Sequence, residues 1–553
     1  MVMTELFGKG CKMMNKIKTA DAIIEGLENS GIKYIFGVPG EENLDVLEAI
    51  RKSKIIKFIL TRHEQEAGFM AATIGRLTGI PGVALSTLGP GATNLVTAAA
   101  YAQLGGMPLL MLTGQKPIRE SKQGAFQIID VVDMMKPITK FSKQLVEGSF
   151  AFSYVREAIR LCTEERPGAV LLEIPEDIAA ENIDYKPIPI SEVRRPIAAE
   201  TSINKIVELL VKAKRPLVVV GAGANRKRTS NMLTDLITKF NIPFVNTQMG
   251  KGVICESFTE FAGTAALSQG DYVHQSISKS DLIINVGHDI VEKPPFIMQG
   301  ARTVVHINFA PAIINEIYYP QYEVVGDIAN AISQLNAKLD LVKDKLDWDT
   351  RYHLESKRKL DESFAIALKG ATTITPQVLV SELRNKIADD GIVTLDNGMY
   401  KIWFARHYCA KQENTLLLDN ALATMGAGLP SAIAAKLVHP NRQVVAVVGD
   451  GGFMMNSQAL ATALALEQNL TVIILEDNSY QMIRWKQHNE GLTFNNPNFV
   501  DYAKSYGANA ICVSKPKEFV EALEVLGQSS GVNVIVVKFD YSNSSESLKI
   551  SNK

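Results

Sequence analysis

The sequence has no surplus of charge of either sign. Its 553 residues hold 58 lysines and arginines against 59 aspartates and glutamates, which gives a formal net charge of −1. A nearly neutral chain has no general electrostatic attraction for nucleic acid or for an anionic membrane surface. We therefore expect its partners to be small molecules held in a site.

Long apolar runs and paired cysteines are also missing. No stretch of 18 uncharged apolar residues occurs, so we expect no membrane-spanning helix. Residues 1–13, which precede the first helical pattern, lack the apolar core and cleavage site of a signal peptide. The five cysteines are scattered without CxxC spacing, as ordinary cytosolic thiols are. These features predict a cytoplasmic protein.

The length of the chain and its alternation of strands and helices predict three α/β domains. One hydrophobic core does not accommodate 553 residues. Short β-rich runs followed by glycine turns and helical patterns recur, which is typical of parallel sheets covered on both faces. We expect an N-terminal domain over 14–185, a central domain over 198–341 and a C-terminal domain over 370–545, each a doubly wound parallel sheet.

One predicted strand ends in an acidic residue among glycines. The apolar run 444–448 leads into Gly449, Asp450, Gly451 and Gly452. Ligands of open parallel sheets bind beyond the carboxyl ends of the strands, and glycines let backbone and ligand approach closely. The helix that follows would point its first N–H groups at the same place, as phosphate-binding helices do.

A second predicted strand, "TVIILED", ends in Asp477 and Asn478 after one intervening helix. If the two strands are neighbours, Asp450 and Asp477 lie close together. Two carboxylates and a backbone carbonyl suit Mg²⁺, which completes its shell with phosphate oxygens. The alternative is that Asp450 only caps a helix and that Asp477 and Asn478 only form a turn.

The two strand ends together resemble the signature of the thiamine diphosphate enzymes, which is a GDG followed by a second polar strand end. The metal ligands of that family imply Asp450, Asp477 and the main chain of Ser479 here. The resemblance extends over nearly the whole chain, in the order pyrimidine-binding, central and diphosphate-binding domain. It implies thiamine diphosphate and Mg²⁺ as cofactors.

The resemblance also implies further contacts with the cofactor. Gly398 and Met399, in "LDNGMYK", occupy a diphosphate loop that often reads G-Q-H or G-S-H in the family. Met425, in "ATMGAGLP", occupies the place of the bulky apolar residue that bends the cofactor. The other residues implied to contact the cofactor are Gly449, Gly451, Gly452, Tyr480 and Met482.

The segment "TRHEQEAGFMAATIGRLTG" resembles the family's RHEQ segment and implies that Glu64 is the catalytic carboxylate. A carboxyl group bonded to the aminopyrimidine ring favours the imino tautomer, whose nitrogen removes the proton from the thiazolium ring. Read without the metal motif, Glu64 would be a solvated charge on a helix. The segment "STLGPGATN" resembles a loop at the pyrimidine end of the cofactor.

Residues 122–130, "KQGAFQIID", resemble the acetohydroxyacid synthases within this family. This implies that Phe126 and Gln127, with Gly40, line the reaction side. The His-His pair of pyruvate-type decarboxylases is missing here. Ile483 stands where those decarboxylases place a glutamate, and an apolar residue there favours ligation over protonation.

Some residues depart from the synthase pattern. Glu41 and Glu42 stand where synthases prefer small residues, whereas decarboxylases can have an acid at the first of these positions. Glu41 could deliver a proton, could select another acceptor, or could be one of two first-turn acids favoured by the helix dipole. Lys486 and Lys293 fall near the positions of the Trp and Arg that select the acceptor in anabolic synthases.

The central segment "VVVGAGANRKR" has a dinucleotide-like turn but lacks the third glycine and the ribose-binding acid. In the family this domain can carry FAD. The segment "GHDIVEKPP" resembles the FAD-free type, so FAD is a possible but not an expected cofactor.

The resemblance implies an enzyme that condenses two pyruvates into 2-acetolactate with release of CO₂, in branched-chain amino acid synthesis or acetoin formation. It implies a homodimer or homotetramer with each active site between chains. One alternative is a 2-oxoacid decarboxylase, or a carboligase or lyase with another donor or acceptor. A nicotinamide dehydrogenase that uses the GAG turn and a non-catalytic binding protein are the remaining alternatives.

Overall fold

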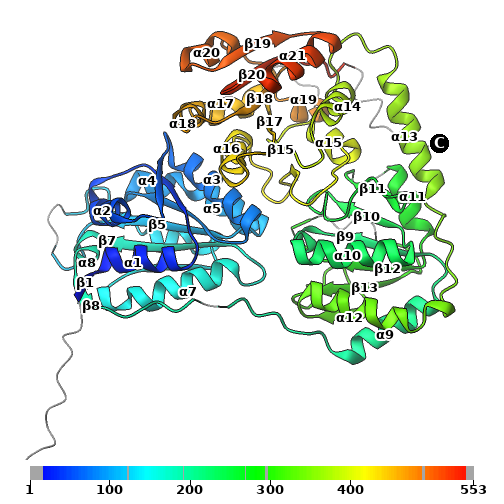
Figure 1. Cartoon of the computed structure of the whole chain (residues 1–553), viewed down its shortest axis with the longest axis horizontal. Coiled ribbons are helices and arrows are strands. Elements are labelled where there is room, and N and C mark those ends of the chain that lie inside the picture. The colour runs from blue at the N-terminus through cyan, green and yellow to red at the C-terminus, as the bar shows by residue number, and fades with distance from the viewer. Residues whose placement is uncertain are drawn as a thin grey trace, which may run out of the picture.

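The computed structural model describes residues 16–120, 124–190, 192–267, 270–289, 291–292, 297–487 and 492–542. These residues form three α/β domains, each around a six-stranded parallel sheet, with the central domain at the right and the C-terminal domain at the top of Figure 1. The predicted fold class is therefore confirmed, whereas the exact domain boundaries stay predictions. No helix of the described residues is long and apolar enough to cross a membrane.

The N-terminal sheet has the strand order β3-β2-β4-β5-β7-β6. A short antiparallel ribbon of β1 (Lys16–Lys18) and β8 (Asn182–Asp184) lies at its margin. The strands are β2 (Tyr34–Gly37), β3 (Lys57–Leu60), β4 (Gly82–Ser86), β5 (Leu109–Gln115), β6 (Phe141–Gln144) and β7 (Ala169–Pro175). The helices are α1 (Thr19–Asn29), α2 (Leu44–Lys52), α3 (Glu64–Thr78), α4 (Gly89–Asn94), α5 (Val96–Gly105), α6 (Val131–Met135), α7 (Ala151–Thr163) and α8 (Glu176–Ala179).

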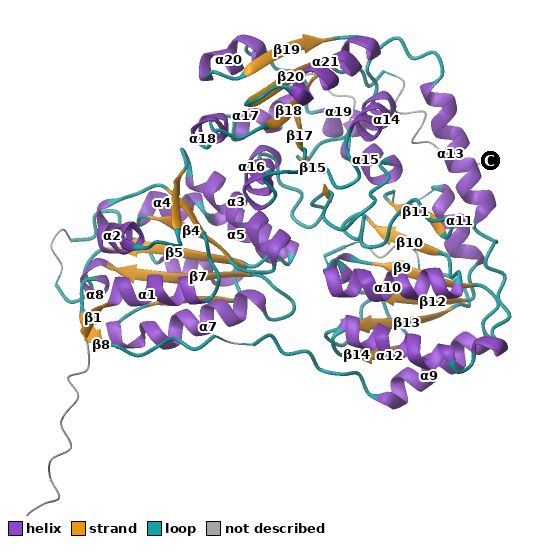
Figure 2. Cartoon of the chain, in the orientation of Figure 1, coloured by secondary structure: helices purple, strands orange, loops and turns teal. Residues whose placement is uncertain are grey.

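The central sheet has the order β11-β10-β9-β12-β13-β14, so the chain reverses direction across the sheet between β9 and β12. Its strands are β9 (Pro216–Val220), β10 (Phe244–Thr247), β11 (Phe261–Ala265), β12 (Leu282–Val286), β13 (Thr303–Asn308) and β14 (Tyr322–Val325). Its helices are α9 (Glu200–Lys212), α10 (Lys227–Phe240), α11 (Tyr272–Lys279) and α12 (Ile328–Asp340). Helix α13 (Leu354–Leu368) runs from this domain towards the C-terminal one (Figure 2).

The C-terminal sheet has the order β16-β15-β17-β18-β20-β19. Its strands are β15 (Ile392–Leu395), β16 (Leu416–Leu417), β17 (Val444–Gly449), β18 (Leu470–Glu476), β19 (Asn509–Val513) and β20 (Val532–Lys538). Its helices are α14 (Pro376–Lys386), α15 (Lys401–His407), α16 (Gly428–Val438), α17 (Asp450–Met455), α18 (Ala459–Ala465), α19 (Gln481–Gln487), α20 (Phe499–Tyr506) and α21 (Pro516–Gln528).

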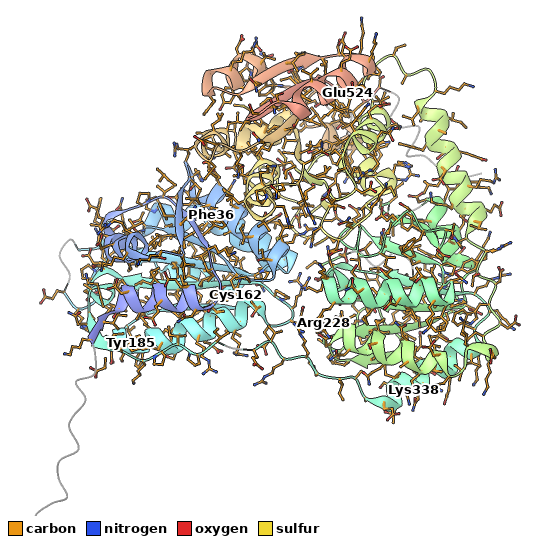
Figure 3. The ribbon with its side chains drawn as sticks, viewed as in Figure 1. Phe36, Cys162, Tyr185, Arg228, Lys338 and Glu524 are labelled. Carbon is orange, nitrogen blue, oxygen red and sulfur yellow. The ribbon has the colours of Figure 1, made fainter. Side chains whose placement is uncertain are left out.

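The central strands of each sheet are buried along their length. Strand β17 reads VVAVVG, and its first five residues are buried. Helices cover both faces of such a parallel sheet, so the strand carries a continuous apolar run and does not alternate apolar with polar residues. Figure 3 shows side chains filling the space between sheets and helices, with Phe36 and Cys162 inside the N-terminal domain.

Buried polar contacts join the domains. Thr73 of α3 donates to Ser431 of α16 over 3.0 Å, which ties the N-terminal to the C-terminal domain. In the central domain, Lys251 lies 2.7 Å from Glu256, and the two side chains are 2% and 0% exposed. Glu256 also accepts a hydrogen bond from the main chain of Ala410, in the C-terminal domain. This ion pair therefore lies where two domains meet.

We predict that Lys251→Met destabilises the protein strongly, because it leaves the Glu256 carboxylate buried without its counter-charge. The expected loss is about 3–5 kcal/mol, measured by urea unfolding. The control is Lys205→Met, which breaks an ion pair with Glu208 whose side chains are 43% and 59% exposed. Exposed pairs contribute less than about 1 kcal/mol. Equal effects of the two substitutions would contradict the prediction.

Candidate active site

The structure brings the two acidic strand ends together. Strands β17 and β18 are adjacent and parallel, with Gly449 opposite Leu475. Asp450 is the first residue of α17 and is 2% exposed. Its Oδ2 accepts hydrogen bonds from the backbone N–H groups of Asp477 (3.2 Å) and Asn478 (2.7 Å). Asp450 is therefore bonded to the neighbouring strand end and does not merely cap its own helix.

The neighbouring acids favour a bound cation. Burial, and after it the Asp450 carboxylate, raise the pKa of Asp477 to about 7. A divalent ion between two such carboxylates removes their repulsion and holds both ionised. Ser479, the third predicted ligand, is 5% exposed, its carbonyl accepts from Gln481, and its Oγ is buried without a hydrogen-bond partner.

The donor set fits Mg²⁺ better than it fits a metal held by protein side chains alone. Within the described ranges no group of three or more His, Cys, Asp or Glu side chains could hold a metal. Two carboxylates and one carbonyl leave the other positions to water and phosphate, as Mg²⁺ requires. The arrangement therefore suits an ion that binds together with a diphosphate.

Asn496 is a site residue that sequence reasoning missed. Its Nδ2 donates to Asp450 Oδ2 and to Asn478 Oδ1, both over 2.8 Å. The amide thus bridges two oxygens in the way that a cation would. Asn496 belongs to no motif, and its approach to the strand ends depends on the path of the chain after α19.

The glycines of the β17 turn leave no room for side chains. A Cβ on Gly451 would lie 2.7 Å from the Tyr480 ring, and one on Gly452 would lie 2.7 Å from Asp396 Oδ2. The Tyr480 ring packs against Phe494, with centroids 5.0 Å apart. Only glycines therefore fit at the start of α17, because the Tyr480 ring and the Asp396 carboxylate lie against the backbone there.

Asp396, which sequence reasoning did not single out, holds the Met425 turn. Both its carboxylate oxygens lie 2.9 Å from the N–H of Gly426, which has φ +89°. Asn456 donates to the Gly426 carbonyl over 2.8 Å. Burial raises the pKa of Asp396 to about 6. Met425 is therefore half-buried in a turn braced from two sides.

The other predicted contacts in this domain lie at the edge of the site. Met399 is 2% exposed and lines the same cavity as Asp477. Met482 packs against the hydrophobic core to which Met399 belongs. Gly398 precedes Met399, and a side chain at Gly398 would collide with the Tyr400 ring.

Glu64 lies in the N-terminal domain and is buried, not a solvated helix charge. It is the first residue of α3 and is 8% exposed. Its Oε2 accepts from Asn94 Nδ2 over 2.9 Å. A Cβ on Gly91 would lie 3.2 Å from its Oε1, so only a glycine fits comfortably there. Asn94 is part of the predicted "STLGPGATN" loop, but its bond to Glu64 was not foreseen.

Gly40, Phe126 and Gln127 gather near the same loop. A side chain at Gly40 would collide with Thr87. Gln127 has φ +58°, and its carbonyl lies 2.6 Å from a Cβ built on Gly89. Phe126 is 62% exposed. The structure therefore places the predicted reaction-side residues together on one edge of the N-terminal domain.

The two acids that depart from the synthase pattern have different surroundings. Glu42 is 5% exposed, lies 2.6 Å from Lys116 and accepts a hydrogen bond from Thr87. Burial opposes ionisation of Glu42, but the bonds from Lys116 and Thr87 outweigh it and lower its pKa. Glu41 is exposed. Only Glu41 is thus available to a substrate.

Helix α3 turns Glu64 away from the C-terminal domain of its own chain. Glu66 is fully buried beside Thr462 of α18, and Thr73 bonds Ser431 of α16. With 3.6 residues per turn, Glu64 lies on the side of the helix opposite both. Of the predicted lysines, Lys486 is exposed in α19, and Lys293 lies outside the described residues.

Comparison with known proteins agrees with this geometry. Three family models match the chain: "Thiamine pyrophosphate enzyme, N-terminal TPP binding domain" over residues 17–134, the central domain over 203–335, and the C-terminal TPP binding domain over 396–537. The chain is 29% identical to the acetolactate synthase of Bacillus subtilis over 546 residues, which cover 96% of this chain and 95% of the relative.

Two further relatives have similar names. The catabolic acetolactate synthase of Raoultella terrigena is 31% identical, over 94% of this chain and 95% of its own. A probable acetolactate synthase large subunit of Methanocaldococcus jannaschii is 32% identical, over 92% and 89%. The chain therefore belongs to the thiamine pyrophosphate enzyme family. It is a thiamine diphosphate-dependent enzyme, similar within that family to the acetolactate synthases.

We predict that Asp450→Asn abolishes metal-assisted binding of thiamine diphosphate, because the amide cannot neutralise a cation. Mg²⁺ with thiamine diphosphate should raise the melting temperature of the wild type. The variant should need at least about 100-fold more Mg²⁺ for the same rise. The control is Asp390→Asn, which changes a carboxylate that is 49% exposed and lies away from the strand ends. A wild-type response of Asp450→Asn would exclude the strand ends as the metal site.

Proposed function

We propose that the protein is a carboligase that condenses two pyruvates into 2-acetolactate with release of CO₂, using thiamine diphosphate and Mg²⁺. The observation that carries the proposal is the contact of Asp450 with the strand end that bears Asp477, because this forms an acidic site, with Asp450 buried and Asp477 half-buried, that suits a metal-bound diphosphate. The three relatives described above are all named as acetolactate synthases, which supports the ligation of two substrates.

The residues of the diphosphate half would hold the cofactor. Asp450, Asp477 and the Ser479 carbonyl would bind Mg²⁺. The N–H of Gly452, in the first turn of α17, would face the phosphates, whereas the N–H of Gly451 donates to Asp450 Oδ1 over 2.8 Å. When bound there, thiamine diphosphate would supply the electron sink that decarboxylation of a 2-oxoacid requires.

The residues of the N-terminal half would handle the proton and the acceptor. Glu64, held by Asn94, would keep a proton at the ring nitrogen of the pyrimidine. Phe126 and Ile483, which are 62% and 44% exposed, would cover the reacting carbon and exclude water. By excluding water, these two side chains would keep a proton source away from the reaction side, which would favour ligation over protonation.

The two halves would meet between chains. The predicted catalytic face of α3 points away from its own C-terminal domain, so a partner chain has to supply the diphosphate half. Large apolar side chains are exposed beside both halves: Leu44 and Phe126 on one, Met455 and Ile483 on the other. A homodimer is thus the smallest unit with complete sites, and a homotetramer would contain two such pairs.

A second candidate function follows from Glu41. The Glu41 carboxyl is exposed, whereas the neighbouring Glu42 forms an ion pair with Lys116. Glu41 can therefore contact a substrate that binds beside Gly40. A carboxyl there could protonate the reacting carbon and release an aldehyde, or could select an acceptor other than pyruvate. Product analysis separates these outcomes.

We predict that the purified protein, with Mg²⁺, thiamine diphosphate and pyruvate, forms 2-acetolactate, which acid converts to acetoin. Two pyruvates should disappear for each CO₂, and addition of a metal chelator should stop the reaction until Mg²⁺ is restored. Glu64→Gln is the matched control, because it keeps the size of the side chain but removes the carboxyl. Acetaldehyde formed in step with CO₂ would overturn the carboligase proposal in favour of a decarboxylase.

A further inference from the structure

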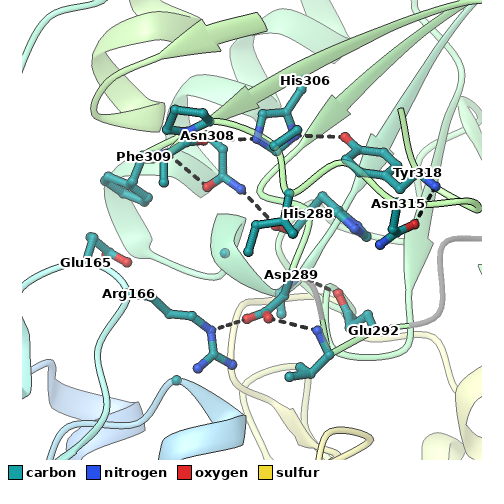
Figure 4. Close-up of a pocket in the computed structure, with 18 of the residues that line it drawn as sticks. Glu165, Arg166, His288, Asp289, Glu292, His306, Asn308, Phe309, Asn315 and Tyr318 are labelled. Atoms are coloured by element: carbon teal, nitrogen blue, oxygen red, sulfur yellow. Dashed lines mark hydrogen bonds and ion pairs between the residues drawn. The ribbon is translucent and has the colours of Figure 1, made fainter. Parts of the chain in front are cut away.

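The central domain contains the cleft that a dinucleotide would use. Ligands of doubly wound sheets bind where the strand order reverses, which here is between the carboxyl ends of β9 and β12. The glycine turn Gly221–Gly223 follows β9 at this place, and Figure 4 shows the cavity beside it. FAD is the group that the family would place in this domain.

The N–H groups of the turn already have acceptors within the chain. Gly221 and Gly223 each donate over 2.8 Å, to the carbonyls of Val286 and Gly287. The next three N–H groups, of residues 224–226, donate to carbonyls inside the turn. Helix α10 begins only at Lys227. A phosphate held by the backbone needs free N–H groups, and none of these five offers one.

The remaining N–H, of Ala222, donates to a carboxylate. It lies 3.0 Å from Glu292 Oε2, while Glu292 Oε1 accepts from Met249 N–H over 3.2 Å. Glu292 is 3% exposed, and its burial raises its pKa to about 7. An anionic group with two oxygens on backbone N–H groups is what a bound phosphate would be. Glu292 therefore occupies the phosphate position of the cleft.

The glycines serve packing and not ligand approach. A Cβ on Gly221 would lie 2.5 Å from the Gly287 carbonyl, and one on Gly223 would lie 3.0 Å from the same atom. Gly287 itself has φ +68°. The turns after β9 and β12 are thus pressed together, which leaves no gap for a pyrophosphate between them.

Both arginines that border this cavity are paired, and Arg226 donates to Glu165 over 3.2 Å. Arg166, from the N-terminal domain, lies 2.6 Å from Asp289 and donates to the carbonyls of Gln103 and Leu104. The cavity in Figure 4 measures about 270 Å³, and a second cavity of about 480 Å³ borders the same turn at Ala222 and Arg226 and reaches the start of α10.

We propose that Glu292 is a built-in substitute for a phosphate, which fills the phosphate position of the glycine turn so that the domain binds neither FAD nor another dinucleotide through this turn. The carboxylate satisfies the two N–H groups that a cofactor would otherwise satisfy, and it joins the ends of β9 and β10. This inference goes beyond the proposed function and does not depend on it.

The test compares the wild type with Glu292→Ala and Glu292→Gln, all saturated with Mg²⁺ and thiamine diphosphate so that the diphosphate site is filled. After incubation with FAD and desalting, the wild type should retain no flavin absorbance. Inorganic phosphate should leave its melting temperature unchanged. Glu292→Ala should melt lower and regain about 3 °C or more with phosphate. Glu292→Gln, which keeps one acceptor oxygen, should fold and respond less.

The matched control is Asp281→Ala. Asp281, in the same domain, accepts hydrogen bonds from two backbone N–H groups, of Lys214 over 2.7 Å and of Arg215 over 3.0 Å, and it does not line the cavity beside the glycine turn. This variant should gain no response to phosphate. Flavin retained by the wild type at one per chain would overturn the proposal. A phosphate response of both Glu292 variants no larger than that of Asp281→Ala would overturn it as well.

Discussion

The proposed chemistry of the protein depends on the repulsion between two carboxylates that the fold places side by side. Parallel pairing of β17 with β18 brings Asp450 against the main chain of Asp477 and Asn478. Burial and the neighbouring Asp450 carboxylate raise the pKa of Asp477, so the doubly ionised pair is costly without a cation. In the proposed site, an ion that joins these acids to a diphosphate would remove that cost and would couple cofactor binding to the folding of the turn.

The orientation of helix α3 determines which chain can complete the proposed site. One side of it, with Glu66 and Thr73, packs against the C-terminal domain of its own chain. The other side carries Glu64, held by Asn94 and bordered by Gly91. Because one helix cannot present both sides to the same domain, Glu64, the proposed catalytic carboxylate, would serve a partner chain. The same packing that stabilises one chain thus leads to the proposed dimer.

Strand ends were predictable from sequence, whereas contacts between distant segments were not. The apolar run 444–448 and the glycines after it predicted both a buried strand and an acid at its carboxyl end. The contacts of Asn496 and Asp396 could not be predicted, because they depend on loops that fold back onto the strand ends. Glu292 was likewise unrecognisable, since nothing local shows that its carboxylate reaches Ala222, seventy residues earlier.

The most direct test of the account is complementation between two inactive chains, Glu64→Gln and Asp450→Asn, co-expressed and purified together. If each site combines Glu64 of one chain with Asp450 of another, the mixed dimer has one intact site. The mixture should then show about one quarter of the wild-type acetolactate rate, because about half of randomly formed dimers are mixed. Each variant alone should be inactive. No recovery in a preparation shown to contain mixed dimers would contradict a site shared between chains.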